Sequence, residues 1–135
     1  MIDKIGIVGA GQMGGGIAHV CALAGLDVTL LDIEDAVLAR AVDTIRGNLA
    51  RQVSRGKITE GEAEAAVARI ATTTDYARFA ACDAVVEAAT ENEEIKRAVF
   101  QSMLPHLRDD ALIASNTSSI SITRLAAGTD PVSYT

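Results

Sequence analysis

The feature that most constrains this 135-residue chain is a glycine-rich turn near its N-terminus, which follows a short apolar run at residues 5–8. Residues 9–14 read GAGQMG, and apolar residues at helical spacing follow until Gly25 predicts a helix end. A second β-like run at residues 28–31 ends in Asp32. Strand, turn, helix, strand and acid together have the size of one βαβ unit, about 30 residues.

The glycines of this turn suit the pyrophosphate of a dinucleotide. Gly9 permits a tight turn, Gly11 lets the backbone approach the phosphates, and Gly14 lets the helix pack on the strand. The helix N-terminus behind the turn favours an anion. A carboxylate at Asp32 can accept both ribose hydroxyls and repels a 2′-phosphate, which favours NAD over NADP. A purely structural turn is the alternative. The predicted cofactor-binding residues here are Gly9, Gly11, Gln12, Met13, Gly14 and Asp32.

Strands and helices alternate along the rest of the chain. We predict helices over residues 35–55, 59–69, 92–104 and 121–127, and strands over residues 70–73, 84–87 and 112–114. Asp35 and Asn92 are expected to be N-caps, and Thr59 with Glu62 has the spacing of a capping box. The fold class is therefore α/β: a Rossmann-type, doubly wound parallel sheet with helices on both faces. We expect one domain over residues 1–130 and a divergent tail over residues 131–135.

Charge and composition exclude several other classes of protein. A net charge of −6 argues against non-specific nucleic-acid binding. No apolar run approaches the roughly 20 residues of a membrane helix, and the N-terminus lacks the pattern of a secretion signal. Two cysteines, Cys21 and Cys82, are too few for a disulfide scaffold, so we expect two buried thiols. A cytoplasmic domain that handles small molecules, without a metal, is the expectation.

Three motifs, in this order, give the sequence its resemblance to a known family. They are IVGAGQMG at residues 7–14, VVEA at residues 85–88 followed by Glu91 and Asn92, and SNTSS at residues 115–119. Over residues 1 to about 130 the chain resembles the 3-hydroxyacyl-CoA dehydrogenase family, which includes bacterial 3-hydroxybutyryl-CoA dehydrogenases. The resemblance implies NAD-dependent interconversion of (S)-3-hydroxyacyl-CoA and 3-oxoacyl-CoA, as in fatty-acid or butanoate metabolism. It also implies an N-terminal domain that holds NAD and a helical C-terminal domain that binds acyl-CoA and forms a dimer.

The resemblance also implies roles for individual residues near the cofactor. Asp32 would hold the adenine ribose, and Glu91 and Lys96 would approach the nicotinamide half of NAD. Ser118 would lie beside the cofactor and hydrogen-bond the 3-oxygen of the substrate, with Asn116 nearby. From the residues alone, a solvated loop charge is the alternative for Glu91 and a helix cap for Ser118, and Lys96 by itself is expected to be a surface lysine.

For the acyl-CoA substrate, the resemblance implies contacts from Asn48 and from Arg55, which takes the place of a basic residue that meets the CoA phosphates. The sequence adds a locally basic stretch of Arg46, Arg51, Arg55 and Lys57 within an acidic chain. Arg51 and Arg55 lie one helical turn apart on the same face. A phosphate-bearing ligand accounts for this stretch, and so does an ordinary solvated helix face.

The general base that the resemblance implies, a histidine beyond the serine motif, has no counterpart in the 135 residues. His19 is expected to pack or face the sheet edge, and His106 to lie at a helix end far from the cofactor. We therefore expect a chain truncated before the catalytic His and the helical domain, which binds NAD with little or no activity. We also expect some self-association through an exposed sheet edge.

Other functions remain open from the sequence alone. The chain could be a non-catalytic NAD-binding module, or a domain whose partner chain supplies the histidine. Another hydroxyacid dehydrogenase, of the 3-hydroxyisobutyrate or 6-phosphogluconate type, is disfavoured by the SNTSS motif. A scaffold without a ligand is disfavoured by the glycine turn together with Asp32.

Overall fold

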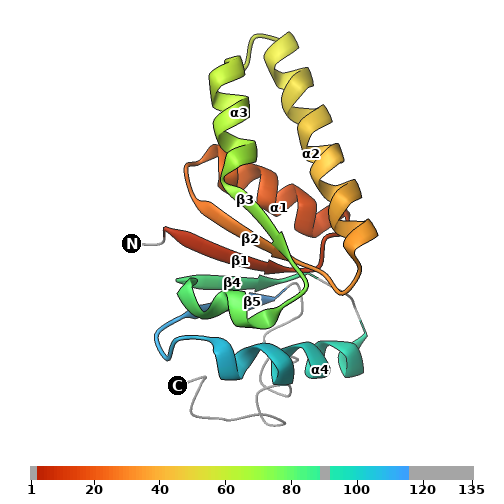
Figure 1. Cartoon of the computed structure of the whole chain (residues 1–135), viewed down its shortest axis with the longest axis vertical. Coiled ribbons are helices and arrows are strands. Elements are labelled where there is room, and N and C mark those ends of the chain that lie inside the picture. The colour runs from red at the N-terminus through yellow and green to blue at the C-terminus, as the bar shows by residue number, and fades with distance from the viewer. Residues whose placement is uncertain (1–2, 89–91, 116–135) are drawn as a thin grey trace.

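A computed structural model describes residues 3–88 and 92–115 of the chain (Figure 1). These residues form a five-stranded parallel sheet in the order β3-β2-β1-β4-β5. The strands are β1 (Lys4–Val8), β2 (Asp27–Leu31), β3 (Ile70–Thr73), β4 (Ala84–Glu87) and β5 (Leu112–Ser115). The α/β fold class is confirmed, with every predicted strand present. The expected helix at 121–127 and the tail lie outside the described residues.

Helices cover both faces of the sheet. On one face lie α1 (Gln12–Leu23), α2 (Asp35–Ser54) and α3 (Glu60–Ala68), and the last two form a hairpin that projects away from the sheet (Figure 1). On the other face lie α4 (Glu93–Met103) and two 3₁₀ turns, η1 (Tyr76–Ala81) and η2 (Leu104–His106). Pro105 falls inside η2, as expected of a residue that ends an α-helix.

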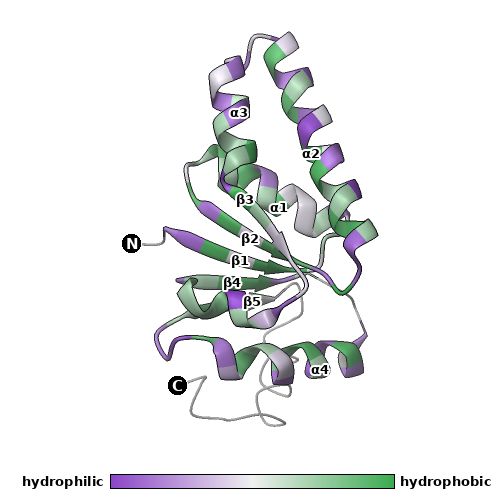
Figure 2. Cartoon of the chain, in the orientation of Figure 1, coloured by the Kyte–Doolittle hydropathy of each residue, from purple (hydrophilic) through white to green (hydrophobic). Residues whose placement is uncertain are grey.

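The strands bury side chains on both faces because helices cover both. Ile7 and Leu30 pack under α1 and α2, whereas Val8 and Leu31 pack with Phe100 under α4. Figure 2 shows hydrophobic residues along the central strands, while α2 and α4 alternate hydrophilic and hydrophobic bands. Side chains of β1, β2 and β4 alternate between the two cores, as period-two alternation predicts for parallel strands covered on both faces. The edge strands contribute less: Ile70 of β3 packs against the first core and Ile113 of β5 against the second.

Local hydrogen bonds explain where the helices begin. The predicted capping box is confirmed: the Thr59 hydroxyl accepts the Glu62 N–H at 3.1 Å, and the Glu62 carboxylate accepts the Thr59 N–H at 3.0 Å. The Asn92 cap is also confirmed, accepting the Ile95 N–H at 3.1 Å. The prediction for Asp35 is wrong, because Asp35 is the first residue of α2 and no side chain caps that end. Asp35 instead places a negative charge in the first turn, which the helix dipole favours.

The two cysteines differ in their burial. Cys82 is buried, as predicted, whereas Cys21 is only half-buried. Burial raises the pKa of both thiols above the usual value, which keeps them in the less reactive protonated form. The two thiols therefore behave as packing residues.

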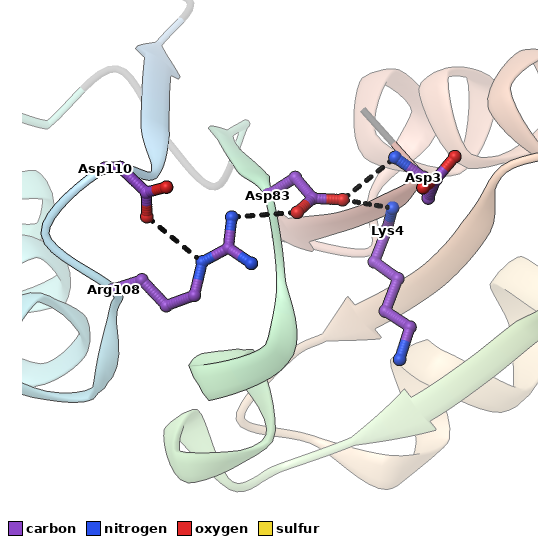
Figure 3. Close-up of polar contacts among 5 residues, drawn as sticks. All are labelled: Asp3, Lys4, Asp83, Arg108 and Asp110. Carbon is purple, nitrogen blue, oxygen red and sulfur yellow. Dashed lines mark hydrogen bonds and ion pairs between the residues drawn. The ribbon is translucent and has the colours of Figure 1, made fainter. Parts of the chain in front are cut away.

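At the amino ends of the central strands, Asp83 joins three segments of the chain (Figure 3). Its Oδ2 accepts the backbone N–H groups of Asp3 at 2.8 Å and Lys4 at 2.9 Å, while its Oδ1 accepts Arg108 at 2.8 Å. Arg108 also pairs with Asp110 at 3.2 Å. The three donors favour the ionised form of the carboxylate. Since they come from different segments, Asp83 links the start of β4 to β1 and to the connection between η2 and β5.

These contacts predict a pH dependence of stability. The backbone N–H groups of Asp3 and Lys4, followed by Arg108, lower the pKa of Asp83 to about 2. Since the folded pKa lies below the unfolded value of about 3.9, the stabilisation is complete above that value and is lost as the pH falls towards 2. We expect Asp83→Asn to lower the urea midpoint at pH 7, with a difference from wild type that shrinks between pH 4 and 2. A difference that is constant down to pH 2 would contradict this role.

Candidate functional site

The glycine turn connects β1 to α1 at the carboxyl edge of the sheet. Gly9 has φ +102°, a conformation that side chains other than glycine rarely adopt. A Cβ built on Gly14 would lie 1.7 Å from the Gly9 carbonyl oxygen, so α1 packs against the turn at a distance that only glycine permits. Two of the three predicted turn glycines therefore have a measurable steric reason to be glycine.

The third turn glycine, Gly11, differs because nothing lies within 4 Å of a Cβ built on it. Gly11 is the N-cap of α1 and has no side chain to cap the helix, so the positive end of α1 faces open space. Gln12 and Met13 are exposed at the same place, Met13 by 52%. An open, positively polarised cradle of this kind fits a pyrophosphate group.

Asp32 contacts this turn from the end of β2. Its Oδ2 accepts the Ala10 N–H at 2.9 Å, and its Oδ1 accepts the Glu34 N–H at 3.2 Å. The Gly9 N–H also donates to the Leu31 carbonyl at 2.7 Å. A carboxylate has about four lone-pair positions, so these contacts leave acceptor capacity for ribose hydroxyls. Asp32 and the glycine turn, which the sequence predicted to serve the same cofactor, therefore lie in direct contact.

A groove between α1 and α2, of about 1030 Å³, begins at the glycine turn and continues to Lys57. We call it the α1–α2 groove. Its described lining holds four cationic side chains and no Asp or Glu, in a chain of net charge −6. The predicted CoA-contacting residues Asn48 and Arg55 both line it. The cationic residues of the lining are Arg40, Arg51, Arg55 and Lys57.

The structure shows that three of the four residues of the predicted basic stretch line the α1–α2 groove and that Arg46 does not. Arg46 lines a separate groove between α2 and α3, and Arg40 occupies the corresponding face instead. Helical phase explains the exchange, because residues 40, 44, 48, 51 and 55 fall on one face of α2. Counting in steps of three and four from Arg55 would have identified Arg40 from the sequence.

Two side-chain pairs lie within this groove. Arg51 donates to Asn48, its neighbour on the same face of α2. His19 on α1 is hydrogen-bonded through Nε2 to Gln52 Oε1 at 2.8 Å, so it packs against α2, one of the two placements that the sequence predicted. His106 is exposed in η2, at the opposite end of α4 from the cofactor edge.

A buried ion pair closes the carboxyl end of β4. Glu87 Oε1 and Lys96 Nζ are 2.6 Å apart, with the two residues 0% and 1% exposed. The interpretation of Lys96 as a surface lysine is therefore wrong. The first turn of α4 lies over the end of β4, which the charged sequence around Lys96 did not indicate. Glu87 belongs to the motif VVEA, but the sequence predicted no role for it.

The carboxylates of Asp32 and Glu87 also act on Tyr76, at the start of η1. Burial raises the pKa of the Tyr76 hydroxyl, and the charges of Asp32 and Glu87 raise it further. The charges of both carboxylates thus affect the half-buried phenol of Tyr76. Asp32 at the end of β2 and Glu87 at the end of β4 therefore both act on one side chain at the carboxyl edge.

Glu91, Asn116 and Ser118 lie outside the described residues, as does the SNTSS motif beyond Ser115, so their roles stay predictions.

Across residues 3–88 and 92–115 no helix is long and apolar enough to cross a bilayer. No cluster of three or more metal-ligating side chains occurs in that part of the chain either.

Comparison with known proteins identifies the family of this chain. The family model "3-hydroxyacyl-CoA dehydrogenase, NAD binding domain" matches residues 4–133. A 3-hydroxybutyryl-CoA dehydrogenase of Bradyrhizobium diazoefficiens is 52% identical over 130 residues, covering 96% of this chain and 44% of the relative. A 3-hydroxyadipyl-CoA dehydrogenase of Escherichia coli is 41% identical over 126 residues, covering 93% of this chain and 26% of that protein.

A solved structure agrees with these matches. The crystal structure of (S)-3-hydroxybutyryl-CoA dehydrogenase PaaH1 from Ralstonia eutropha superposes with a TM-score of 0.91 at 45% identity. The match covers 98% of this chain and 47% of that one, so the chain spans less than half the length of its relatives. This chain belongs to the 3-hydroxyacyl-CoA dehydrogenase family, in which it corresponds to the NAD-binding domain.

Proposed function

We propose that this chain is the cofactor-binding part of an enzyme that interconverts (S)-3-hydroxyacyl-CoA and 3-oxoacyl-CoA. The observation that carries the proposal is the open cradle at Gly11, bounded by Asp32 and continuous with a cationic groove. Bound NAD supplies the hydride acceptor or donor. The turn and the α1 N-terminus hold its pyrophosphate, and Asp32 accepts its ribose hydroxyls.

The remaining site roles follow from the motif match. Lys96 and Glu91 serve the nicotinamide half of the cofactor, and Ser118, with Asn116 nearby, hydrogen-bonds the substrate 3-oxygen. Neither histidine of the 135 residues suits general-base catalysis at this edge: His19 is bonded to Gln52 and His106 lies in η2. We therefore propose that the 135-residue polypeptide binds NADH but turns over acetoacetyl-CoA slowly or not at all. Turnover at the rate of a full-length relative would contradict this.

The α1–α2 groove is proposed to take the CoA part of the substrate. Two relatives are named for 3-hydroxybutyryl-CoA and 3-hydroxyadipyl-CoA, which share CoA and differ in the acyl chain. CoA carries phosphate groups, and the groove concentrates positive charge without a described carboxylate in its lining. Arg55 and Asn48 are the contacts that the family resemblance implies, and Arg51, which lines the same groove, donates to Asn48.

Arg55→Ala is expected to weaken CoA binding about five- to tenfold, as the loss of one charge-assisted hydrogen bond predicts. The effect should decrease at high salt because the site is open to solvent. Calorimetric titration with free CoA measures it. Arg46→Ala is the matched control, because it removes the same charge from α2, whose C-cap residue is Arg55, and because Arg46 lines the other groove. Equal losses in the two variants would indicate a long-range charge effect rather than a contact.

We also propose that the chain self-associates through β5. Among the described residues this strand pairs with β4 alone, and its Leu112 is 61% exposed. Such an edge offers N–H and C=O groups to another strand. Light scattering across a concentration series should show mass rising above that of a 14.0 kDa monomer. A constant monomer mass at the highest concentration would contradict the proposal.

A further inference from the structure

The buried ion pair between Glu87 and Lys96 joins two elements at the carboxyl edge. Glu87 is the last residue of β4, and Lys96 lies in the first turn of α4, where its N–H donates to the Asn92 carbonyl at 3.0 Å. The two charged atoms are 2.6 Å apart, and both residues are almost fully buried. The pair therefore fixes the start of α4 against the end of β4.

The strand order places this pair at a particular point in the sheet. The sheet is built outward in two directions, from β1 to β2 and β3 on one side and through β4 to β5 on the other. Ligands of open α/β sheets bind where this order reverses, which here is between β1 and β4. In register, Glu87 stands beside Val8, the residue before the glycine turn, and beside Ser115, which begins the serine motif. The Ala88 N–H bonds the Val8 carbonyl at 2.8 Å.

A buried ion pair is by itself weak evidence of a stabilising role. Removing two charges from water is costly, and apolar side chains of similar volume often stabilise a core as well or better. The other three residues of β4 are the apolar Ala84, Val85 and Val86. At the opposite end of the same strand, Asp83 shows how a carboxylate can fasten strands while remaining partly in solvent.

We propose that Glu87 is a positioning residue for the nicotinamide half of NAD. Its carboxylate holds the Lys96 ammonium at the point where the sheet order reverses, so that this charge is already oriented when the cofactor binds. The inference rests on the proposed function in assigning the β4 end to the nicotinamide half. Glu87 acts through Lys96 and makes no contact with the cofactor itself.

The test compares two ligands that differ at one end. NADH carries the nicotinamide, whereas ADP-ribose has the adenosine, pyrophosphate and second ribose without it. Wild type, Glu87→Gln, Lys96→Met and the double variant are titrated with each ligand by calorimetry, after thermal melts confirm folding. The double variant removes both buried charges together, which keeps the experiment decisive where a single variant fails to fold. Asp83→Asn is the matched control, an acid-to-amide change at the other end of β4.

The proposal predicts that Glu87→Gln and the double variant each lose about tenfold in NADH affinity, while their ADP-ribose affinity stays within about twofold. Lys96→Met should lose as much as the double variant, because Glu87 acts through Lys96. Asp83→Asn should change neither affinity. Parallel losses for both ligands, or unchanged NADH binding in the folded double variant, would overturn the proposal. Wild type that binds neither ligand would instead overturn the proposed function, and this inference with it.

Discussion

Gly14→Ala is expected to abolish NADH binding and to lower the free energy of unfolding by about 3 kcal/mol, the upper part of the range for overpacking. The added Cβ would lie 1.7 Å from the carbonyl oxygen and 2.9 Å from the carbonyl carbon of Gly9. Both atoms belong to the backbone of the turn, so relief requires α1 or the turn to move. Urea unfolding and NADH titration of the same sample measure the two effects.

Two further glycine variants separate folding from binding. Gly11→Ala adds a Cβ to open space, so it should keep its stability while occupying the room that the pyrophosphate needs. Gly61→Ala, in the exposed first turn of α3, is the control and should be neutral or stabilising by about 0.5 kcal/mol. A folded Gly14→Ala variant with unchanged NADH affinity would show that the close approach of α1 to the turn is not required.

Asp32→Asn is expected to weaken NADH binding and to narrow the preference for NADH over NADPH at least about tenfold. The amide keeps one acceptor oxygen, but it loses the acceptor pair that spans the Ala10 and Glu34 N–H groups. It also removes the charge that repels a 2′-phosphate. Competitive titration with the two reduced cofactors measures the ratio of their dissociation constants.

Glu34→Gln is the matched control for this prediction. It removes the same charge two residues away, from an exposed side chain that caps no helix. We expect its cofactor ratio to stay within about twofold of wild type. If Glu34→Gln narrows the ratio as much as Asp32→Asn does, the preference arises from net charge near the turn rather than from Asp32.

The sequence was sufficient for the features whose cause is local. The glycine turn, the acid that contacts it and the Thr59–Glu62 capping box depend on residue type and spacing, and the structure confirms all three. Alternating strands and helices likewise identified the parallel sheet, because a helix that connects two strands returns the chain to the same edge and leaves the strands parallel. Within the described residues, these features position the candidate cofactor site.

Features that depend on tertiary packing were not predictable in the same way. Lys96 lies in a run of charged residues that reads as a solvated helix start, yet packing on β4 buries it against Glu87. By contrast, the helical phase that places Arg40 rather than Arg46 in the α1–α2 groove could have been counted from the sequence. Asp35 had the residue type of a helix cap, but the helix begins one residue too early for it to serve.

The central claim is that the glycine turn and Asp32 form an NAD site in this chain. Titration of the purified polypeptide with NADH, with NADPH in parallel, tests it most directly. The account predicts saturable NADH binding and NADPH binding at least about tenfold weaker, as repulsion of the 2′-phosphate by Asp32 requires. Equal affinities, or no binding by a chain that melts cooperatively in circular dichroism, would contradict it.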